Sequence, residues 1–270
     1  MSIKLIAVDM DGTFLNTEMS YNRPYFESLL KRMKEKNIHF ICASGNQLPQ
    51  LLNYFEGLES EITFIAENGA YVYDDGKELY LAVMKDSIVR RAIRALQAYG
   101  DGKVAFAICG KEKAYVLKET DEKYLDLFKK FYIELEKVDH FDEVTDEIVK
   151  FTSNFGVEDV SEMVTYLNDE LGDVLTPLAS GNGFIDLLLN DVDKGLGMKL
   201  LQERWAISAD ESAAFGDSPN DIAMLQSVTH SYAMENATPS VKEVAAYEIG
   251  HNDTDSLLNT IEKIIESVAD

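Results

Sequence analysis

The stretch Ile3-Lys4-Leu5-Ile6-Ala7-Val8-Asp9-Met10-Asp11-Gly12-Thr13 begins with a mostly apolar run, which two aspartates one residue apart follow. Residues 3–8 predict a β-strand that is buried on both faces, as in a parallel sheet. Ligands of open α/β sheets bind outside the carboxyl ends of the strands. Asp9 and Asp11 therefore indicate a polar site at the end of this strand, although Asp and Gly are also common in turns.

The flanking segments alternate between strand and helix patterns. After the first strand we expect helices at 22–36 and 47–56 and strands at 38–43 and 62–66. The alternation returns later, with strands at 212–215 and 230–233 and helices at 194–205, after Ser218, at 239–246 and at 254–267. Strands that alternate with helices favour βαβ units and a doubly wound parallel sheet.

The middle of the chain has a different pattern. Strands at 70–73 and 78–83 flank the turn signal Asp74-Asp75-Gly76. Further elements are expected as helices at 86–98, 121–133 and 159–171 and as strands at 104–109, 114–117, 148–154, 174–178 and 184–188. We therefore predict an α/β fold: a doubly wound core from residues 1–83 and 187–270, with an inserted α+β cap at 84–186. Inserted domains at the mouth of such a sheet often act as lids.

Composition limits the classes of partner. The 270 residues are enough for one or two domains, and 46% hydrophobic with 27% charged residues is ordinary for a globular protein. The charge is unusual, because 25 basic and 48 acidic residues give −23. Such a field repels nucleic acid and anionic membranes. We expect neither partner, no membrane span and a cytoplasmic location, while the oligomeric state stays open.

Cysteine and histidine patterns point away from disulfide and zinc chemistry. Cys42 and Cys109 are not a C-x-x-C pair and lie in apolar runs, so we expect reduced core residues. The four histidines lack zinc-ligand spacing, and no P-loop motif occurs.

A second acidic cluster follows the predicted strand at 212–215: Gly216-Asp217-Ser218-Pro219-Asn220-Asp221. Ser218 and Asp221 have the spacing of a capping box, which would explain Asp221 without any ligand. Asp217 precedes the cap and lies at the strand end. Two acidic corners on one parallel sheet would converge at one edge, and such oxygen-rich sites suit Mg²⁺.

Two further features fit an anion site. Ser44 and Gly45 follow a strand and precede a helix, where a hydroxyl and free N–H groups hold phosphate or serve as an ordinary N-cap. Lys194 stands at a helix start, against the helix dipole. It is either solvated or paired with a carboxylate or phosphate.

Together these motifs resemble the haloacid dehalogenase superfamily, and within it the Cof-type sugar phosphatases of bacteria with an inserted cap. Asp9-Met10-Asp11-Gly12-Thr13 is similar to the first motif, Ser44 to the second, Lys194 to the third, and Gly216 to Asp221 to the fourth. Asn46 departs from the pattern, because many relatives have arginine there. This departure leaves open which phosphorylated sugar the protein prefers.

The resemblance implies a Mg²⁺-dependent phosphatase that hydrolyses small sugar phosphates. Asp9 would form an aspartyl-phosphate, and Asp11 would act as general acid and then base, oriented by Thr13. Mg²⁺ would be held by the carboxylates of Asp9 and Asp217 and by the backbone carbonyl of Asp11, with Asp221 supporting its waters.

The phosphoryl oxygens would be bound by Ser44, Gly45, Lys194 and Asn220. The cap would exclude water and contact the sugar. Two alternatives remain, a sugar phosphomutase with the same covalent chemistry and a non-catalytic phosphosugar-binding protein. A signalling receiver domain is disfavoured, because receivers are shorter and carry their phosphorylated Asp on a later strand.

Overall fold

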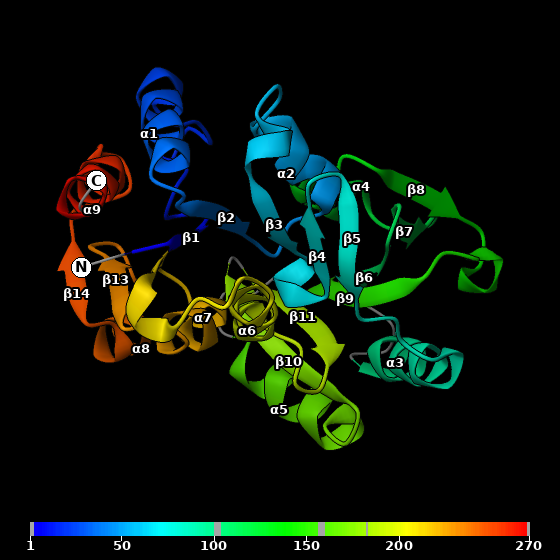
Figure 1. Ribbon diagram of the computed structural model, residues 1–270. Helices are drawn as coiled ribbons and strands as arrows, with labels where there is room; N and C mark the ends of the chain where they lie inside the picture. Colours follow the sequence, from blue (N-terminus) through cyan, green and yellow to red (C-terminus); the bar gives the residue numbers. More distant parts are fainter. Residues whose placement is uncertain (1–2, 100–103, 156–159, 182, 269–270) are drawn as a thin grey trace.

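The computed structural model describes residues 3–99, 104–155, 160–181 and 183–268, and it contains two β-sheets (Figure 1). The strands of the first sheet are β1 (Leu5–Asp9), β2 (His39–Ala43), β3 (Thr63–Ala66), β4 (Tyr71–Asp74), β5 (Lys77–Leu81), β12 (Ser212–Gly216), β13 (His230–Met234) and β14 (Tyr247–Ile249). They are ordered β14-β13-β12-β1-β2-β3-β4-β5. The strands from β14 to β3 are parallel, and β4 and β5 add an antiparallel hairpin at the edge.

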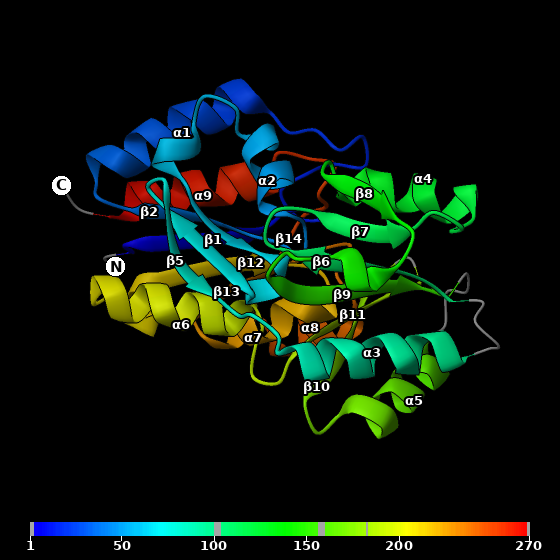
Figure 2. The same cartoon turned by 90° about the vertical axis from the view of Figure 1, so that its right-hand side faces the viewer.

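Helices cover both faces of this sheet (Figure 2). One face carries α1 (Arg23–Glu35), α2 (Leu48–Tyr54) and α9 (Ser256–Ser267), and the other carries α6 (Lys194–Trp205), α7 (Ile222–Gln226) and α8 (Pro239–Val244). All five residues of β1 are buried, because the strand is covered from both sides. The predicted doubly wound α/β fold is confirmed.

The strand order determines where a ligand can bind. β1 lies between β12 and β2, so the chain winds in opposite directions on its two sides. The crevice beyond the carboxyl ends of strands at such a switch point is the usual ligand site of doubly wound sheets. Asp9 ends β1, and Asp217 directly follows β12. The two predicted acidic corners therefore meet at the switch point.

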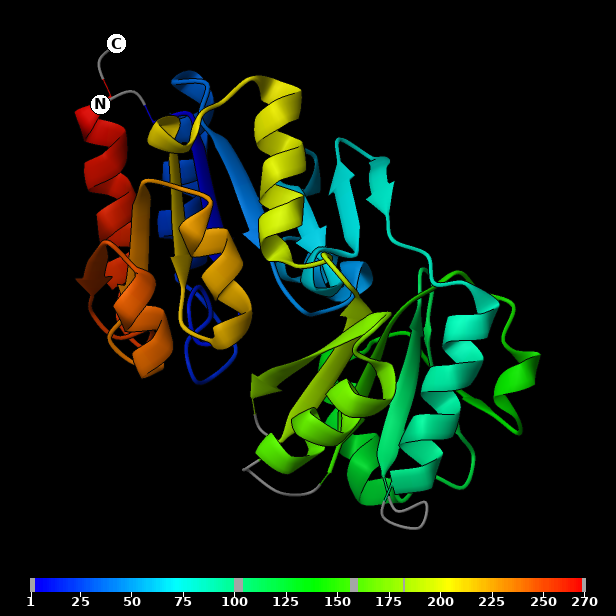
Figure 3. The ribbon, with the colours of Figure 1, turned by 90° about the horizontal axis from the view of Figure 1, so that it is seen from below.

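The second sheet has six strands: β6 (Ala105–Gly110), β7 (Ala114–Leu117), β8 (Leu135–Val138), β9 (Ile148–Asn154), β10 (Leu175–Gly181) and β11 (Phe184–Leu189). Their order is β10-β11-β9-β6-β7-β8, antiparallel except for the parallel pair β7 and β8. Figure 3 shows this sheet and its helices α3 (Asp86–Ala98), α4 (Glu122–Phe131) and α5 (Ser161–Leu171) beside the first sheet.

The two faces of the second sheet have different partners. In β6, Phe106 and Ile108 pack in one cluster with α3 and α5, whereas Ala105 and Ala107 pack in another with α4. Side chains alternate between faces along a strand. On β9 and β11 this alternation puts Phe151 and Leu187 among the helices and leaves their polar neighbours for the opposite face.

Most expected elements are present, with shifted ends. Two short strands, β8 and β14, were not predicted, and the expected helices at 121–133 and 239–246 are shorter, as α4 and α8. The expected helix at 159–171 begins at Ser161 as α5, and residue 159 lies outside the described residues. Both cysteines are free and buried, as expected. Within the described ranges, no helix has the length and apolar character needed to cross a membrane.

Candidate active site

Lys194 connects two acidic corners of the sheet. It is the first residue of α6 and is fully buried. Its Nζ donates to Asp9 Oδ1 at 2.5 Å and to Asp221 Oδ1 at 2.7 Å. Of the two interpretations of this lysine, the structure therefore shows the paired one. The ammonium holds the Asp9 carboxylate in a defined orientation at the end of β1.

Asp221 combines the capping role with an ionic one. Its Oδ2 accepts the backbone N–H groups of Asp217 and Ser218, both at 3.0 Å, as the capping-box spacing predicts. Its Oδ1 pairs with Lys194. The side chain is fully buried, so both its oxygens are used to fix the loop after β12.

Thr13 bonds to a different aspartate from the one expected. Its Oγ1 donates to Asp217 Oδ1 at 3.0 Å, and Ser218 Oγ donates to Asp217 Oδ2 at 3.0 Å. The expectation that Thr13 orients Asp11 is wrong, because its hydroxyl reaches the neighbouring acidic corner instead. Gly12, which lies between Asp11 and Thr13 in the sequence, has φ +83°. A Cβ at Gly12 would lie 2.6 Å from Asp217 Oδ2.

Asn46 takes the place that Thr13 was expected to have. Its Nδ2 donates to Asp11 Oδ2 at 2.8 Å. Asp11 Oδ1 is buried and has no hydrogen-bond partner among the described residues. Asp11 is therefore held by one oxygen and has the other available for a proton or a ligand.

The acidic corners carry more negative charge than Lys194 can neutralise. Burial raises the pKa of Asp9 well above its usual value, and Asp221 raises it further against the opposing effect of Lys194. Burial and Asp221 likewise raise the pKa of Asp217 to about 6. Ligand atoms of Asp9, Asp217 and Asp221 lie within 4.8 Å of one another. An all-oxygen, acid-rich donor set of this kind fits a hard divalent cation such as Mg²⁺.

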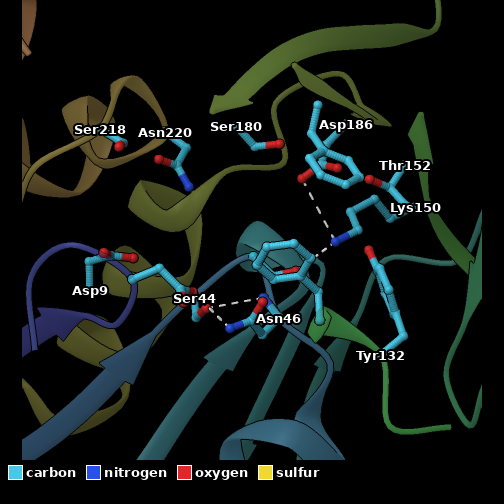
Figure 4. Close-up of a pocket in the computed structure, with 14 residues that line it drawn as sticks. Asp9, Ser44, Asn46, Tyr132, Lys150, Thr152, Ser180, Asp186, Ser218 and Asn220 are labelled. Carbon is cyan, nitrogen blue, oxygen red and sulfur yellow. Dashed lines mark hydrogen bonds and ion pairs between the residues drawn. The ribbon is translucent and has the colours of Figure 1, made fainter. Parts of the chain in front are cut away.

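A cavity of about 100 Å³ opens beside Asp9 and Asp11 (Figure 4). Ser44, Gly45 and Asn220 line it, and their expected contacts with phosphate stay a prediction. Ser44 Oγ accepts the N–H of Asn46 at 3.0 Å, which shapes this loop. The lining does not include Thr13, Lys194, Asp217 and Asp221.

Residues from the second sheet and from the end of α4 close the cavity, and the sequence analysis did not identify them. They are Phe131, Tyr132, Lys150, Thr152, Ser180, Phe184 and Asp186. A signal existed for two of them, because Lys150 and Asp186 interrupt otherwise apolar strand patterns. Charged residues are almost never buried unless they are paired. Asn68 is a further residue of the site, since its Oδ1 accepts from Asn220 Nδ2 at 3.0 Å, but an Asn-Gly pair by itself indicates only a turn.

The fold and this geometry agree with comparisons to known proteins. The family model for haloacid dehalogenase-like hydrolases matches residues 6–261, and the chain belongs to this family. A relative is the 5-amino-6-(5-phospho-D-ribitylamino)uracil phosphatase YbjI of Escherichia coli K12, 38% identical over 269 residues that cover 100% of this chain and 98% of that protein.

Solved structures show the same fold over nearly the whole chain. SMU.1108c from Streptococcus mutans UA159 has a TM-score of 0.94 at 32% identity, covering 98% of this chain and 100% of that one. The subclass IIB sugar phosphatase BT4131 has a TM-score of 0.82 at 20% identity, covering 97% and 98%. With its phosphatase relatives in this family, the chain is a phosphoric monoester hydrolase.

Proposed function

We propose that this phosphatase hydrolyses small phosphorylated sugars with Mg²⁺ and forms an aspartyl-phosphate on Asp9. The observation that carries the proposal is the Asp9–Lys194 ion pair at 2.5 Å, at the edge of a cavity that Asp11 also lines. A nucleophile must be fixed in orientation, and the buried ammonium supplies that restraint.

The side chains divide the reaction between them. Asp9 attacks phosphorus, and Asp11 protonates the leaving oxygen and then accepts a proton from the attacking water. Asn46 keeps Asp11 turned toward the reaction by its hydrogen bond to Oδ2. Ser44, Gly45 and Asn220 bind phosphoryl oxygens from the cavity wall, while Lys194 acts from behind Asp9.

Mg²⁺ would be held by Asp9, Asp217 and the backbone carbonyl of Asp11, with Asp221 supporting the site. Bound there, the cation neutralises the negative charge of the phosphoryl group and of the carboxylates that face it. Thr13 and Ser218 prepare this site by fixing both oxygens of Asp217.

The second sheet is the part that recognises the substrate in this proposal. We assign residues 84–189 as the cap domain and residues 1–83 and 190–270 as the catalytic core, because β11 continues past the expected boundary at 186 and ends at Leu189. Support comes from the seven lining residues that the second sheet and α4 contribute to the cavity. A cytoplasmic location completes the proposal, and the two free, buried cysteines fit a reducing compartment.

The test is release of inorganic phosphate from a panel of sugar phosphates, with and without Mg²⁺, by the wild type and by Asp9→Asn. The expected result is Mg²⁺-dependent release that falls by at least a thousandfold in Asp9→Asn, because an amide cannot act as the nucleophile. Lys194 still has Asp221 as a partner in this variant, so the fold should persist and circular dichroism should be unchanged.

Two outcomes would contradict the proposal. Release by Asp9→Asn at the wild-type rate would exclude Asp9 as the nucleophile. No release by the wild type, combined with transfer of phosphate between hydroxyls of a sugar bisphosphate, would favour the phosphomutase.

A further inference from the structure

Lys150 and Asp186 bring opposite charges from the second sheet to the cavity. Both are nearly fully buried, at 1% and 4% exposure. Lys150 Nζ lies 2.6 Å from Glu67 Oε2, 2.6 Å from the carbonyl oxygen of Gly45 and 3.8 Å from Asp186 Oδ2. Glu67 is thus the close partner of the ammonium. Asp186 is a second carboxylate that this lysine does not fully neutralise.

The two oxygens of Asp186 have different surroundings. Oδ2 accepts a hydrogen bond from Asn68 Nδ2 at 2.7 Å, and Asn68 in turn bonds to Asn220. Oδ1 accepts no hydrogen bond from the described residues, and Asp186 lines the cavity. Oδ1 is not one of the enclosed side-chain atoms without a partner in the described residues, so it is open to the cavity that Asp186 lines. Asn68 therefore fixes Asp186 through Oδ2, and Oδ1 can accept a hydrogen bond from a ligand.

The end of the cavity around Asp186 has a polar side and an aromatic side. Asp9 lies at one end of the cavity, and Asp186, Lys150 and Thr152 lie at the other (Figure 4). Thr152 is directly opposite Asp186 in the strand pairing of β9 and β11. The aromatic lining consists of Phe131, Tyr132 and Phe184. A polyhydroxylated carbon chain matches both sides, because it presents O–H donors and apolar C–H groups.

We propose that Asp186 recognises the leaving group: its Oδ1 accepts a hydrogen bond from a hydroxyl of a neutral, polyhydroxylated leaving group, and its charge rejects leaving groups that carry a carboxylate or a second phosphate. This inference rests on the proposed phosphatase function of the same cavity. It also gives a physical reason against a phosphomutase, because the second phosphate of its bisphosphate substrate would lie beside the carboxylate of Asp186.

The two carboxylates that lie near Lys150 Nζ, those of Glu67 and Asp186, provide a matched pair of variants. Asp186→Asn and Glu67→Gln each remove one negative charge from the same ammonium, but among these two Asp186 alone lines the cavity. Three phosphate esters separate the effects: p-nitrophenyl phosphate has no donor on its leaving group, ribitol 5-phosphate has several, and 5-phospho-D-ribonate replaces the terminal alcohol by a carboxylate. The readout is the ratio of kcat/KM between esters, which does not depend on the folded fraction.

In Asp186→Asn, the ratio of kcat/KM for ribitol 5-phosphate to that for p-nitrophenyl phosphate should fall about 10- to 150-fold, the range expected for a hydrogen bond to a charged group. The preference for ribitol 5-phosphate over 5-phospho-D-ribonate should shrink at the same time. Glu67→Gln should keep both ratios at wild-type values.

Equal losses on all three esters in Asp186→Asn would overturn the proposal, since Asp186 would then have a structural role. A wild type that prefers 5-phospho-D-ribonate would overturn it as well. Failure of the wild type to hydrolyse any of the three esters would instead contradict the proposed phosphatase function.

Discussion

The buried ammonium of Lys194 is a residue-scale feature on which the whole site depends. A lysine at a helix N-terminus is unfavourable for the helix dipole, and burial alone lowers its pKa. Asp221 and Asp9 outweigh burial and raise the pKa of Lys194 above its usual value. The lysine therefore stays charged. It offsets part of the repulsion between carboxylates that the reaction needs close together.

His39 provides a pH-dependent prediction away from the site. Its ring stacks on Trp205, with centroids 3.8 Å apart and planes 10° from parallel. His39 is exposed on its other side, but loss of water where the ring packs lowers its pKa, against the opposing charge of Asp74. The folded state therefore binds the proton less well than the unfolded state, whose histidine has a pKa of about 6.5. The stability contributed by His39 should be complete above pH 6.5 and fall as the pH drops through that value toward the folded-state pKa.

Trp205 is the only tryptophan of the sequence, so its emission reports the protonation of His39. The fluorescence titration should have a midpoint below 6.5, and the transition should disappear in His39→Gln. Chemical unfolding of the two proteins should diverge between pH 7.5 and 5.5, with the wild type losing more stability. A midpoint at or above 6.5 would show that the stacked ring favours its charged form.

At the scale of elements, the segment Glu67–Gly69 joins the parts of the site. All three residues have positive φ, at 51°, 54° and 99°. The backbone N–H groups of Glu67 and Asn68 donate to the carbonyl oxygens of Asn46 and Ser44. Left-handed backbone is costly for residues other than glycine. The ion pair of Glu67 and the hydrogen bonds of Asn68 offset that cost and connect this segment to the second sheet.

Gly69 and Gly76 give a matched test of this segment. Both have positive φ, but a Cβ at Gly69 would lie 2.0 Å from the carbonyl oxygen of Asp193, whereas Gly76 has open space around it. Gly76→Ala should cost about 1–2 kcal/mol of unfolding free energy, from backbone strain alone. Gly69→Ala should cost about 2–5 kcal/mol, because overpacking adds to the strain.

Gly69→Ala should also lower kcat about a hundredfold, because the displaced backbone precedes Lys194 and shifts the partner of Asp9. Gly76→Ala should keep the wild-type kcat. Urea unfolding and phosphate release measure the two effects. Similar stabilities for the two variants would mean that the backbone at Asp193 moves away without cost.

The elements that escaped prediction share one physical property. β8 reads Leu135-Glu136-Lys137-Val138 and β14 reads Tyr247-Glu248-Ile249, and each lies at the edge of its sheet. Edge strands are short and partly exposed, so they lack the apolar pattern of buried strands. The inner strands of the core are continuously apolar and were predictable, because both of their faces are covered.

The molecule as a whole carries a charge of −23, which leads to a prediction about salt. Like charges repel most at low ionic strength, where the screening length is about 30 Å, and little at 0.15 M, where it is about 8 Å. The melting temperature should therefore rise by about 2–4 °C between 10 and 150 mM NaCl, corresponding to roughly 1 kcal/mol. A fall in melting temperature would mean that attractive ion pairs dominate the surface.

At matched ionic strength, Mg²⁺ should raise the free energy of unfolding further, because in the proposed function it binds the folded protein. At a hundred times its Kd the gain is about 2.7 kcal/mol. This gain should be absent in Asp217→Asn and retained in Asp126→Asn, which removes an exposed carboxylate on α4. Equal gains in both variants would mean that Mg²⁺ acts through the net charge alone.

Strand–helix alternation, the acidic ends of β1 and β12 and the membership of one family were determined by the sequence alone, because they depend on local pattern and spacing. Other features depend on which residues the fold brings together. Lys194 pairs with Asp9 across 185 positions, Lys150 reaches Gly45 across 105, and Asn68 holds Asp186 across 118. The first pairing joins β1 to α6, and the other two join β9 and β11 to loops at strand ends of the first sheet, so no local pattern encodes them. Tertiary structure therefore decided which side chains line the cavity.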